Sequence, residues 1–250
     1  MTVPVGLMDG DGGMARPTTP ATDTRDASIS IIVPMLNERS ALPELLSHLA
    51  ALRGRGCEVW LVDGGSDDGS PELAIARGYP VLHSERGRAR QMNAGAGAAS
   101  GSVLLFLHAD TRLPDDADRL LVRALATSGR IWGRFDVRIA GRSRWLILVA
   151  TLMNWRSRLT GIATGDQAIF VRRDAFAAVG GFPNQPLMED IELARRLKRI
   201  SRPLCIKTRA TTSGRRWEAR GVWRTILLMW SLRFAYWRGT SADSLAARYR

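Results

Sequence analysis

The chain has 250 residues, of which 45% are hydrophobic and 24% are charged. This composition excludes a wholly disordered chain and is enough for one substantial domain or two very small ones. No run of about 18 or more apolar residues is present, so the sequence predicts no membrane-spanning helix. Cys57 and Cys205 both lie in apolar stretches, which argues against a disulfide scaffold or a cysteine zinc site and favours a reducing cytoplasm.

The net charge of +12 is unevenly distributed. Residues 1–129 carry 12 basic and 16 acidic side chains, whereas residues 130–250 carry 24 basic and 8 acidic ones. A genomic preference for arginine would explain why lysine is rare, but it would not explain this asymmetry. A basic half indicates an anionic partner, such as nucleic acid, a phosphorylated substrate or an anionic lipid surface.

Residues 1–27 are rich in Gly, Pro, Thr and Asp and lack both apolar periodicity and the pattern of a signal peptide, so we predict a disordered tail. Strands and helices are then expected to alternate, with strands at 28–34, 58–62, 79–83 and 103–107 and helices at 38–53, 71–77, 88–99 and 115–128. Continuous apolar strands in a βαβ series predict an α/β fold with a mostly parallel sheet covered on both faces.

After residue 130 the pattern is less regular. We expect strands at 131–139 and 168–171, a short strand at 204–206, an apolar run at 145–153 and a helix at 191–200. A final long helix is expected over 220–238. The predicted organisation is therefore a tail (1–27), one domain (28–217) and a basic amphipathic C-terminal region (218–250).

Polar side chains follow three of the predicted strands at their carboxyl ends, where ligands bind in parallel sheets. They are Asn37 and Glu38 after the first strand, Asp63 after the second, and His108 and Asp110 after the fourth. A single acidic residue at a strand end is often only a turn former. Three successive strand ends with such groups predict a binding site.

Four segments together resemble the family 2 glycosyltransferases, namely residues 31–38, 62–70, 106–110 and 188–190. They occur in that family's order, and the resemblance covers about residues 28–217. It is closest to a subgroup of small bacterial transferases known mainly from the neighbourhood of radical-enzyme genes. The subgroup's hallmarks are similar to Gln91–Gly95, His108–Thr111, Gly165–Gln167 and Arg215–Trp217.

The resemblance implies a GT-A fold and an inverting transfer of a sugar from a nucleotide-diphosphate donor, a UDP- or GDP-sugar, to an unknown acceptor hydroxyl. It implies that the second acid of the family's D-x-D motif, here Asp110, binds Mn²⁺ or Mg²⁺ on the diphosphate. His108 stands at the first position of that motif, where it is either a second metal ligand or a residue that orients Asp110. The residues assigned to the donor are Pro34, Asn37, Glu38, Asp63, Arg88, Gln91, His108, Arg215, Arg216 and Trp217.

Inverting transfer needs one carboxylate to accept the proton of the attacking hydroxyl. Glu189 and Asp190 begin a predicted helix, where acids are also favoured simply by capping and by the helix dipole. The family's base is the Asp of this pair, so the resemblance assigns the base to Asp190 and a supporting role to Glu189. Asp166 is the reserve candidate.

Two other functions fit the sequence less well. A nucleotidyltransferase on a related scaffold would have a glycine-rich phosphate loop after the first strand, but residues 34–38 contain no glycine. A nucleic-acid binder would show a basic stripe with aromatic stacking platforms, whereas these arginines flank carboxylates and apolar helices. We therefore expect no nucleic-acid partner.

The C-terminal helix leaves a further choice open. On a helical wheel a basic strip contains Arg220, Arg224 and Arg238, and the opposite side is apolar except for Arg233, whose long stem would let its charge reach the edge. That pattern fits a helix lying on the inner face of an anionic membrane, which would favour a lipid-linked acceptor. It fits equally a helix packed on the domain, with residues 145–153 as its partner.

Overall fold

The computed structural model describes residues 27–249, with the exception of the side chain of Arg216. Nearly all of the predicted tail therefore lies outside the described residues. The first half contains β1 (Ile29–Met35), α1 (Leu42–Gly54), β2 (Glu58–Asp63), α2 (Ser70–Ala76), β3 (Val81–His83), α3 (Arg88–Ala98), β4 (Val103–Phe106), β5 (Thr111–Arg112) and α4 (Ala117–Ser128). The alternation of strands and helices expected here is confirmed.

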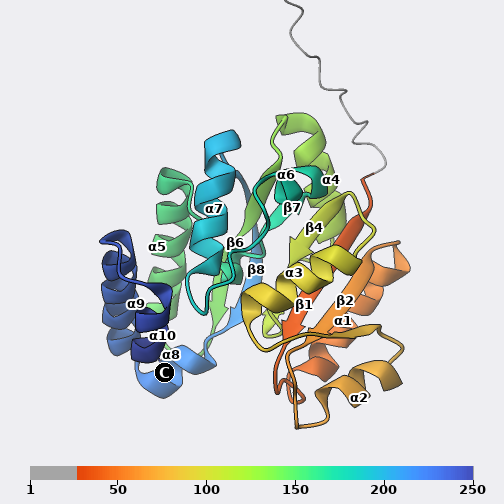
Figure 1. The fold of residues 1–250 in the computed structure, drawn as a ribbon, viewed down its shortest axis with the longest axis horizontal. Helices are drawn as coiled ribbons and strands as arrows, with labels where there is room; N and C mark the ends of the chain where they lie inside the picture. The colour runs from red at the N-terminus through yellow and green to blue at the C-terminus, as the bar shows by residue number, and fades with distance from the viewer. Residues whose placement is uncertain (1–26, 250) are drawn as a thin grey trace, which may run out of the picture.

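The second half contains β6 (Trp132–Ala140), α5 (Trp145–Thr160), a 3₁₀ helix (Gly165–Gln167), β7 (Phe170–Arg172), α6 (Arg173–Ala178), α7 (Glu189–Ile200), β8 (Leu204–Ser213), α8 (Arg215–Arg220), α9 (Val222–Trp237) and α10 (Ala242–Tyr249). Figure 1 shows α5, α9 and α10 gathered on one side of the molecule and α1 and α2 on the other.

One sheet of eight strands joins the two halves in the order β3-β2-β1-β4-β7-β6-β8-β5. The strands β3, β2, β1 and β4 run parallel, and β7 pairs antiparallel with both β4 and β6. The expected α/β class with a mixed, mostly parallel sheet is therefore confirmed. The antiparallel β7 brings the second half of the chain against the carboxyl end of β4.

The two faces of the parallel strands bury different helices because successive side chains point to opposite faces. Ile31 and Val33 face α1 and α4 in one buried cluster. Ile32 and Phe106 face α3, α6 and α7 in the other. This double coverage explains why the strands read as continuous apolar runs, and it leaves the strand ends as the accessible part of the sheet.

Three of the expected elements differ in length or continuity, and β5, α6 and α10 are additional to those expected. The expected strand at 204–206 extends to Ser213, because it pairs in parallel with β6 along its polar second half and not through an apolar face. The apolar run at 145–153 continues as helix α5 to Thr160. The expected helix over 220–238 is divided at Gly221, whose φ of 82° is left-handed and starts α9 afresh.

Candidate active site

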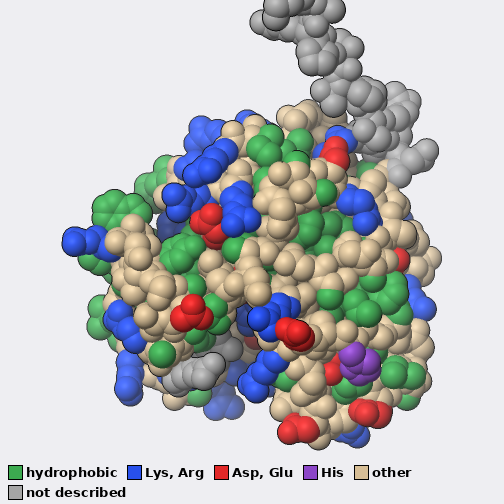
Figure 2. All heavy atoms as spheres, in the orientation of Figure 1, with side chains coloured by type: hydrophobic (Ala, Val, Ile, Leu, Met, Phe, Trp, Pro, Cys, Tyr) green, Lys and Arg blue, Asp and Glu red, His purple; other side chains and the backbone are tan. Residues whose placement is uncertain are grey.

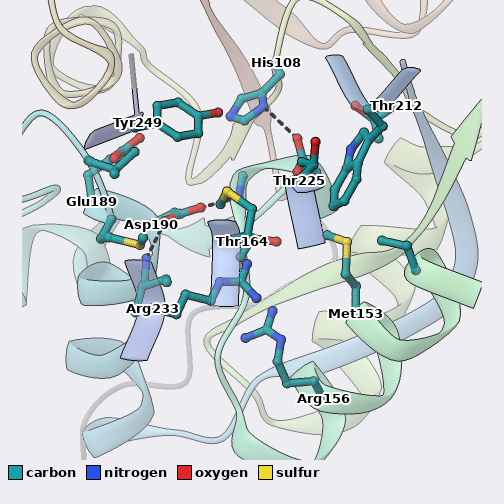
Figure 3. A pocket seen from close by; sticks show the side chains of 18 of the residues that line it. His108, Met153, Arg156, Thr164, Glu189, Asp190, Thr212, Thr225, Arg233 and Tyr249 are labelled. Carbon is teal, nitrogen blue, oxygen red and sulfur yellow. Dashed lines mark hydrogen bonds and ion pairs between the residues drawn. The ribbon is translucent and has the colours of Figure 1, made fainter. Parts of the chain in front are cut away.

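A cavity of about 570 Å³ lies where the carboxyl ends of β1 and β4 meet the 3₁₀ helix, the start of α7, and helices α5 and α9. Figure 3 shows side chains from these elements around it. The cavity lining contains both charged and large apolar side chains. The charged or titratable ones are Glu38, Arg88, His108, Asp110, Arg156, Asp166, Glu189, Asp190 and Arg233, and the apolar ones include Val149, Leu152, Met153, Trp155, Leu159, Ile226, Met229 and Trp230.

His108 is held in place by the 3₁₀ helix and not by Asp110. Its Nδ1 lies 3.3 Å from Asp166 Oδ1. A Cβ atom added to Gly165 would lie only 2.2 Å from His108 Nε2, so a residue without a side chain is needed for this close approach. Both ring nitrogens therefore face residues 165–166, and this arrangement favours a positioning role for His108 over a metal-ligand role.

Asp190 connects the 3₁₀ helix to the first turn of α7. Its Oδ2 accepts a hydrogen bond from the Gly165 N–H at 2.8 Å, and its Oδ1 accepts one from the Ile191 N–H at 2.7 Å. Met188 precedes this turn with a left-handed φ of 65°, which aims the pair of acids into the cavity. The predicted base and its reserve, Asp166, thus lie on the same wall and are linked through one backbone segment.

Glu189 is the buried member of the pair. Its side chain is 5% exposed and lies 3.9 Å from Arg88 Nη1. Burial raises the pKa of Glu189, the negative charge of Asp190 raises it further, and Arg88 offsets part of the effect. The site therefore contains one acid that resists ionisation beside another whose two oxygens accept backbone hydrogen bonds.

Asp110 has the surroundings expected of a carboxylate that holds a hard cation. It is half-buried and lines the cavity, and its carboxylate accepts one long hydrogen bond, from Thr111 Oγ1 at 3.4 Å. No group of three or more metal-ligating side chains is found within residues 27–249. One protein carboxylate completed by substrate phosphates and water is a common arrangement for Mg²⁺, so Asp110 fits a cation that arrives with a diphosphate.

Only some of the residues that were predicted to bind the nucleotide line the cavity. Pro34 and Glu38 line the cavity, but Asn37 and Asp63 are absent from its lining. Asp63 accepts hydrogen bonds from the N–H groups of Gly65 and Ser66 and from the Ser66 hydroxyl. Burial opposes its ionisation, but the hydrogen bonds from Ser66, Gly65 and His83 together outweigh burial and lower the pKa of Asp63. Its carboxylate thus shapes the turn that follows β2.

Gln91 also braces the sheet and does not line the cavity. From α3 its Nε2 donates to the carbonyls of Met35 and Val62 at 2.7 and 2.8 Å. Met35 is the last residue of β1 and Val62 the penultimate residue of β2, so Gln91 fixes the spacing of the two strand ends. Its predicted place at the donor is therefore indirect.

The predicted Arg215–Arg216–Trp217 segment forms part of α8. Trp217 is half-buried, packs against the cluster that contains Val137 and Leu146, and lines the cavity. Arg215 is exposed, and its Nε donates to Ser213 Oγ at 3.1 Å. The side chain of Arg216 lies outside what the structure describes.

Two charged lining residues were not assigned to the site from the sequence. Arg156 on α5 and Arg233 on α9 both contribute to the cavity wall. Arg233 was expected to extend toward the membrane edge, but its Nε is buried. Each arginine stands between apolar residues of its helix. This position predicts that the aliphatic part of the side chain is buried, but it does not predict where the guanidinium group points.

The chain belongs to the Glycosyl transferase family 2, whose sequence profile matches residues 30–180. That match covers more than half of the chain and includes β1 to β7. The chain is therefore a glycosyltransferase, and the nucleotidyltransferase alternative is set aside.

Curated relatives are similar over part of their length. An undecaprenyl-phosphate 4-deoxy-4-formamido-L-arabinose transferase of Pseudomonas paraeruginosa is 32% identical over 157 residues, which is 58% of this chain and 46% of the relative. A protein of the same description from Salmonella paratyphi A is 30% identical over 108 residues, 38% of this chain and 33% of the relative. The chain thus spans about half or less of the length of these relatives.

Solved structures confirm the GT-A fold. TarS of S. aureus, residues 1–349, matches with a TM-score of 0.61 and 16% identity over 75% of this chain and 60% of that one. Glucosyl-3-phosphoglycerate synthase of Mycobacterium tuberculosis, in complex with Mg²⁺ and UDP, matches with a TM-score of 0.58 and 21% identity over 75% of this chain and 70% of that one. Within the described residues no helix is long and apolar enough to cross a membrane.

Proposed function

We propose that this glycosyltransferase is inverting and metal-assisted and that it moves a sugar from a nucleotide-diphosphate donor to an acceptor hydroxyl in the cavity described above. One observation carries the proposal. Asp110 lies far in the sequence from the neighbouring pair Glu189 and Asp190, and all three line the same cavity beside the carboxyl ends of β1 and β4. Ligands of open α/β sheets bind at this edge.

In the proposed step the acceptor oxygen attacks the anomeric carbon while the bond from that carbon to the diphosphate breaks. The hydroxyl proton moves to Asp190, and the electron pair of the broken bond leaves with the nucleotide diphosphate. Attack opposite the leaving group inverts the anomeric configuration. Glu189 and Arg88 lie beside Asp190, where they would orient the acceptor and the donor respectively.

Asp110 would hold the divalent cation, which supplies charge neutralisation for the diphosphate as it leaves. The nearly unpartnered carboxylate of Asp110 supports this assignment. A metal-bound diphosphate leaves without protonation, so a single carboxylate base is enough. The ring of His108, braced by Asp166, would keep the adjacent wall in position.

UDP- and GDP-sugars are the proposed donors, and the UDP found in the Mycobacterium synthase, in one complex with Mn²⁺, gives UDP priority. A thermal-shift screen of UDP-, GDP- and TDP-sugars with and without Mn²⁺ tests the proposal. A metal-dependent rise in Tm with one nucleotide is expected, since a ligand stabilises in proportion to occupancy. The absence of a shift with every nucleotide at saturating concentration would contradict donor binding.

A peripheral contact with the inner face of an anionic membrane is the second part of the proposal. Helices α5 and α9 expose large apolar side chains in two stripes, each at helical spacing and each 44–79% exposed: Trp145, Leu148, Leu152, Trp155 and Leu159 on α5, and Trp223, Leu227, Trp230, Phe234 and Trp237 on α9. Figure 2 shows hydrophobic and basic side chains next to one another along this edge. Apolar patches of this extent mark interaction surfaces.

The structure also shows α9 packed on the domain, because Val222 and Ile226 join the cluster formed by α5 and β6. Packing and membrane contact are therefore compatible, since they use different sides of the same helix. Flotation with phosphatidylglycerol vesicles at low salt tests the contact. Protein that remains at the bottom of the gradient would contradict it, and replacing Trp230 and Trp237 by Ser should abolish flotation if the stripes insert.

A further inference from the structure

Two arginines that line the cavity have side-chain nitrogens without a hydrogen-bond partner. Nε and Nη2 of Arg156 and Nε of Arg233 are inaccessible to solvent and form no hydrogen bond within residues 27–249. These inner nitrogens are closed to the cavity as well as to water, so a ligand would meet the outer nitrogens of the two guanidinium groups. Two neighbouring cations that line one cavity favour an anionic ligand there.

The two guanidinium groups come from different helices and converge. Figure 3 shows Arg156 extending from α5 and Arg233 from α9 toward the same part of the cavity. Burial lowers the pKa of Arg156 to about 10, and the positive charge of Arg233 contributes to this shift. The negative charge of Asp190 raises the pKa of both arginines, and that of Asp166 raises the pKa of Arg233. These carboxylates form none of the missing hydrogen bonds.

The cavity continues from the arginines into apolar surroundings that reach the protein surface. Leu152, Trp155 and Leu159 of α5 and Trp230 of α9 line the cavity, and each is also about half or more exposed. They belong to the two apolar stripes on α5 and α9. A ligand bound at the arginines would therefore have a route for a long apolar chain along these helices.

We propose that Arg156 and Arg233 form a binding site for the phosphate of a lipid acceptor, whose apolar chain lies along α5 and α9 and whose head-group hydroxyl reaches Asp190. This rests on the function proposed above and adds the chemical class of the acceptor. Two guanidinium forks present planar pairs of donors that match phosphate oxygens. The apolar wall beside them distinguishes a lipid phosphate from a small soluble phosphate.

Calorimetric titration with monomeric decyl phosphate tests the site in the full-length protein. Arg156→Gln and Arg233→Gln should each weaken binding by about 10- to 100-fold, the usual worth of a charged hydrogen bond. Arg224→Gln, on the same helix as Arg233 but exposed to solvent, is the matched control and should bind like the wild type. Leu152→Ser should weaken decyl phosphate but leave inorganic phosphate unchanged.

The same variants separate a ligand site from a structural one. If the arginines bind a ligand, each Gln variant without ligand should have an equal or higher Tm, because an unpartnered buried cation has been removed. A lower Tm in both variants, with unchanged decyl phosphate binding, would overturn the proposal. Inorganic phosphate that binds as tightly as decyl phosphate would replace the lipid by a soluble phosphate, and would also overturn it.

Donor binding provides the last distinction. The thermal shift with the nucleotide sugar should be the same in wild type, Arg156→Gln and Arg233→Gln. Loss of that shift in the two variants would mean that the arginines bind the donor diphosphate, which contradicts an acceptor site. A wild type that binds decyl phosphate but no nucleotide sugar would refute the proposed function and leave the phosphate site intact.

Discussion

The two halves of the chain differ in whether the polar groups near the cavity have hydrogen-bond partners within the protein. In residues 27–128 the groups at the strand ends satisfy one another. Asp63 is bound by Ser66 and Gly65, and Gln91 is bound to the ends of β1 and β2. These two side chains therefore hold the strand ends of the scaffold and do not line the cavity.

Residues 129–249 contain charged groups beside the cavity that the protein itself does not fully pair. Arg156 and Arg233 carry buried nitrogens without hydrogen-bond partners, and Glu189 is a buried acid with a raised pKa. The same half exposes the apolar stripes of α5 and α9. In the first half, polar groups at the strand ends hold the scaffold together, whereas in the second half charged groups at the cavity are left without hydrogen bonds where ligands are proposed to bind.

The largest effect is expected from Asp190→Asn, which preserves size and removes the base. Turnover should fall by ~10²–10⁴-fold, with donor affinity little changed. Steady-state kinetics together with donor binding measures both quantities. Asp166→Asn is the control. Near-normal turnover in Asp190→Asn alongside collapse in Asp166→Asn would move the base to Asp166.

Arg134→Met tests a buried charged group of the second half that has hydrogen-bond partners within the chain. Arg134 is inaccessible, pairs with Asp136, and donates to Ser157 Oγ and the Asn154 carbonyl. Its removal leaves Asp136 buried with fewer partners, so stability should fall by about 3–5 kcal/mol in denaturant unfolding.

Arg158→Met is the matched control for Arg134→Met, because Arg158 pairs with the same Asp136 from a position that is 32% exposed. Its loss should cost less, since water can replace the missing partner. Equal losses in the two variants would mean that burial does not set the cost of this ion pair.

Asp110→Ala tests whether the first half of the chain, residues 27–128, also contributes a ligand-binding group. Donor affinity in Mn²⁺ or Mg²⁺ should fall by about 10- to 100-fold, as for losses in metal sites. Calorimetry with the nucleotide sugar found in the screen measures this. EDTA should bring the wild type down to the level of the variant, and an EDTA-resistant wild type would refute the metal role.

The smallest effect is expected from Glu189→Gln and depends on pH. Because burial raises the pKa of Glu189 in the folded state, the folded protein binds more protons than the unfolded chain above about pH 4.5. Wild-type stability from this group is therefore present at low pH and lost as pH rises through the folded pKa. The Tm of Glu189→Gln relative to wild type should rise over that window and be flat below it; a constant difference would contradict the raised pKa.

Much of the fold and part of the site could be predicted. Apolar runs such as residues 103–107 predicted buried parallel strands. The acids at 110, 166, 189 and 190 were predicted to serve one site, and all four line the same cavity. The extension of β8 to Ser213 was not predictable, because its second half is polar and is held by backbone pairing to β6. Periodicity reports burial of side chains and carries no signal for such pairing.

The sequence by itself determined the α/β architecture and the polar residues at the strand ends, because local apolar periodicity and chain order are enough to specify them. Only the tertiary structure decided where Asp63, Gln91, Arg156 and Arg233 direct their polar atoms. A side chain can turn either toward its own scaffold or into the cavity, and the choice depends on which backbone groups and helices pack beside it. Those neighbours are distant in the chain, so only the packed fold brings them together.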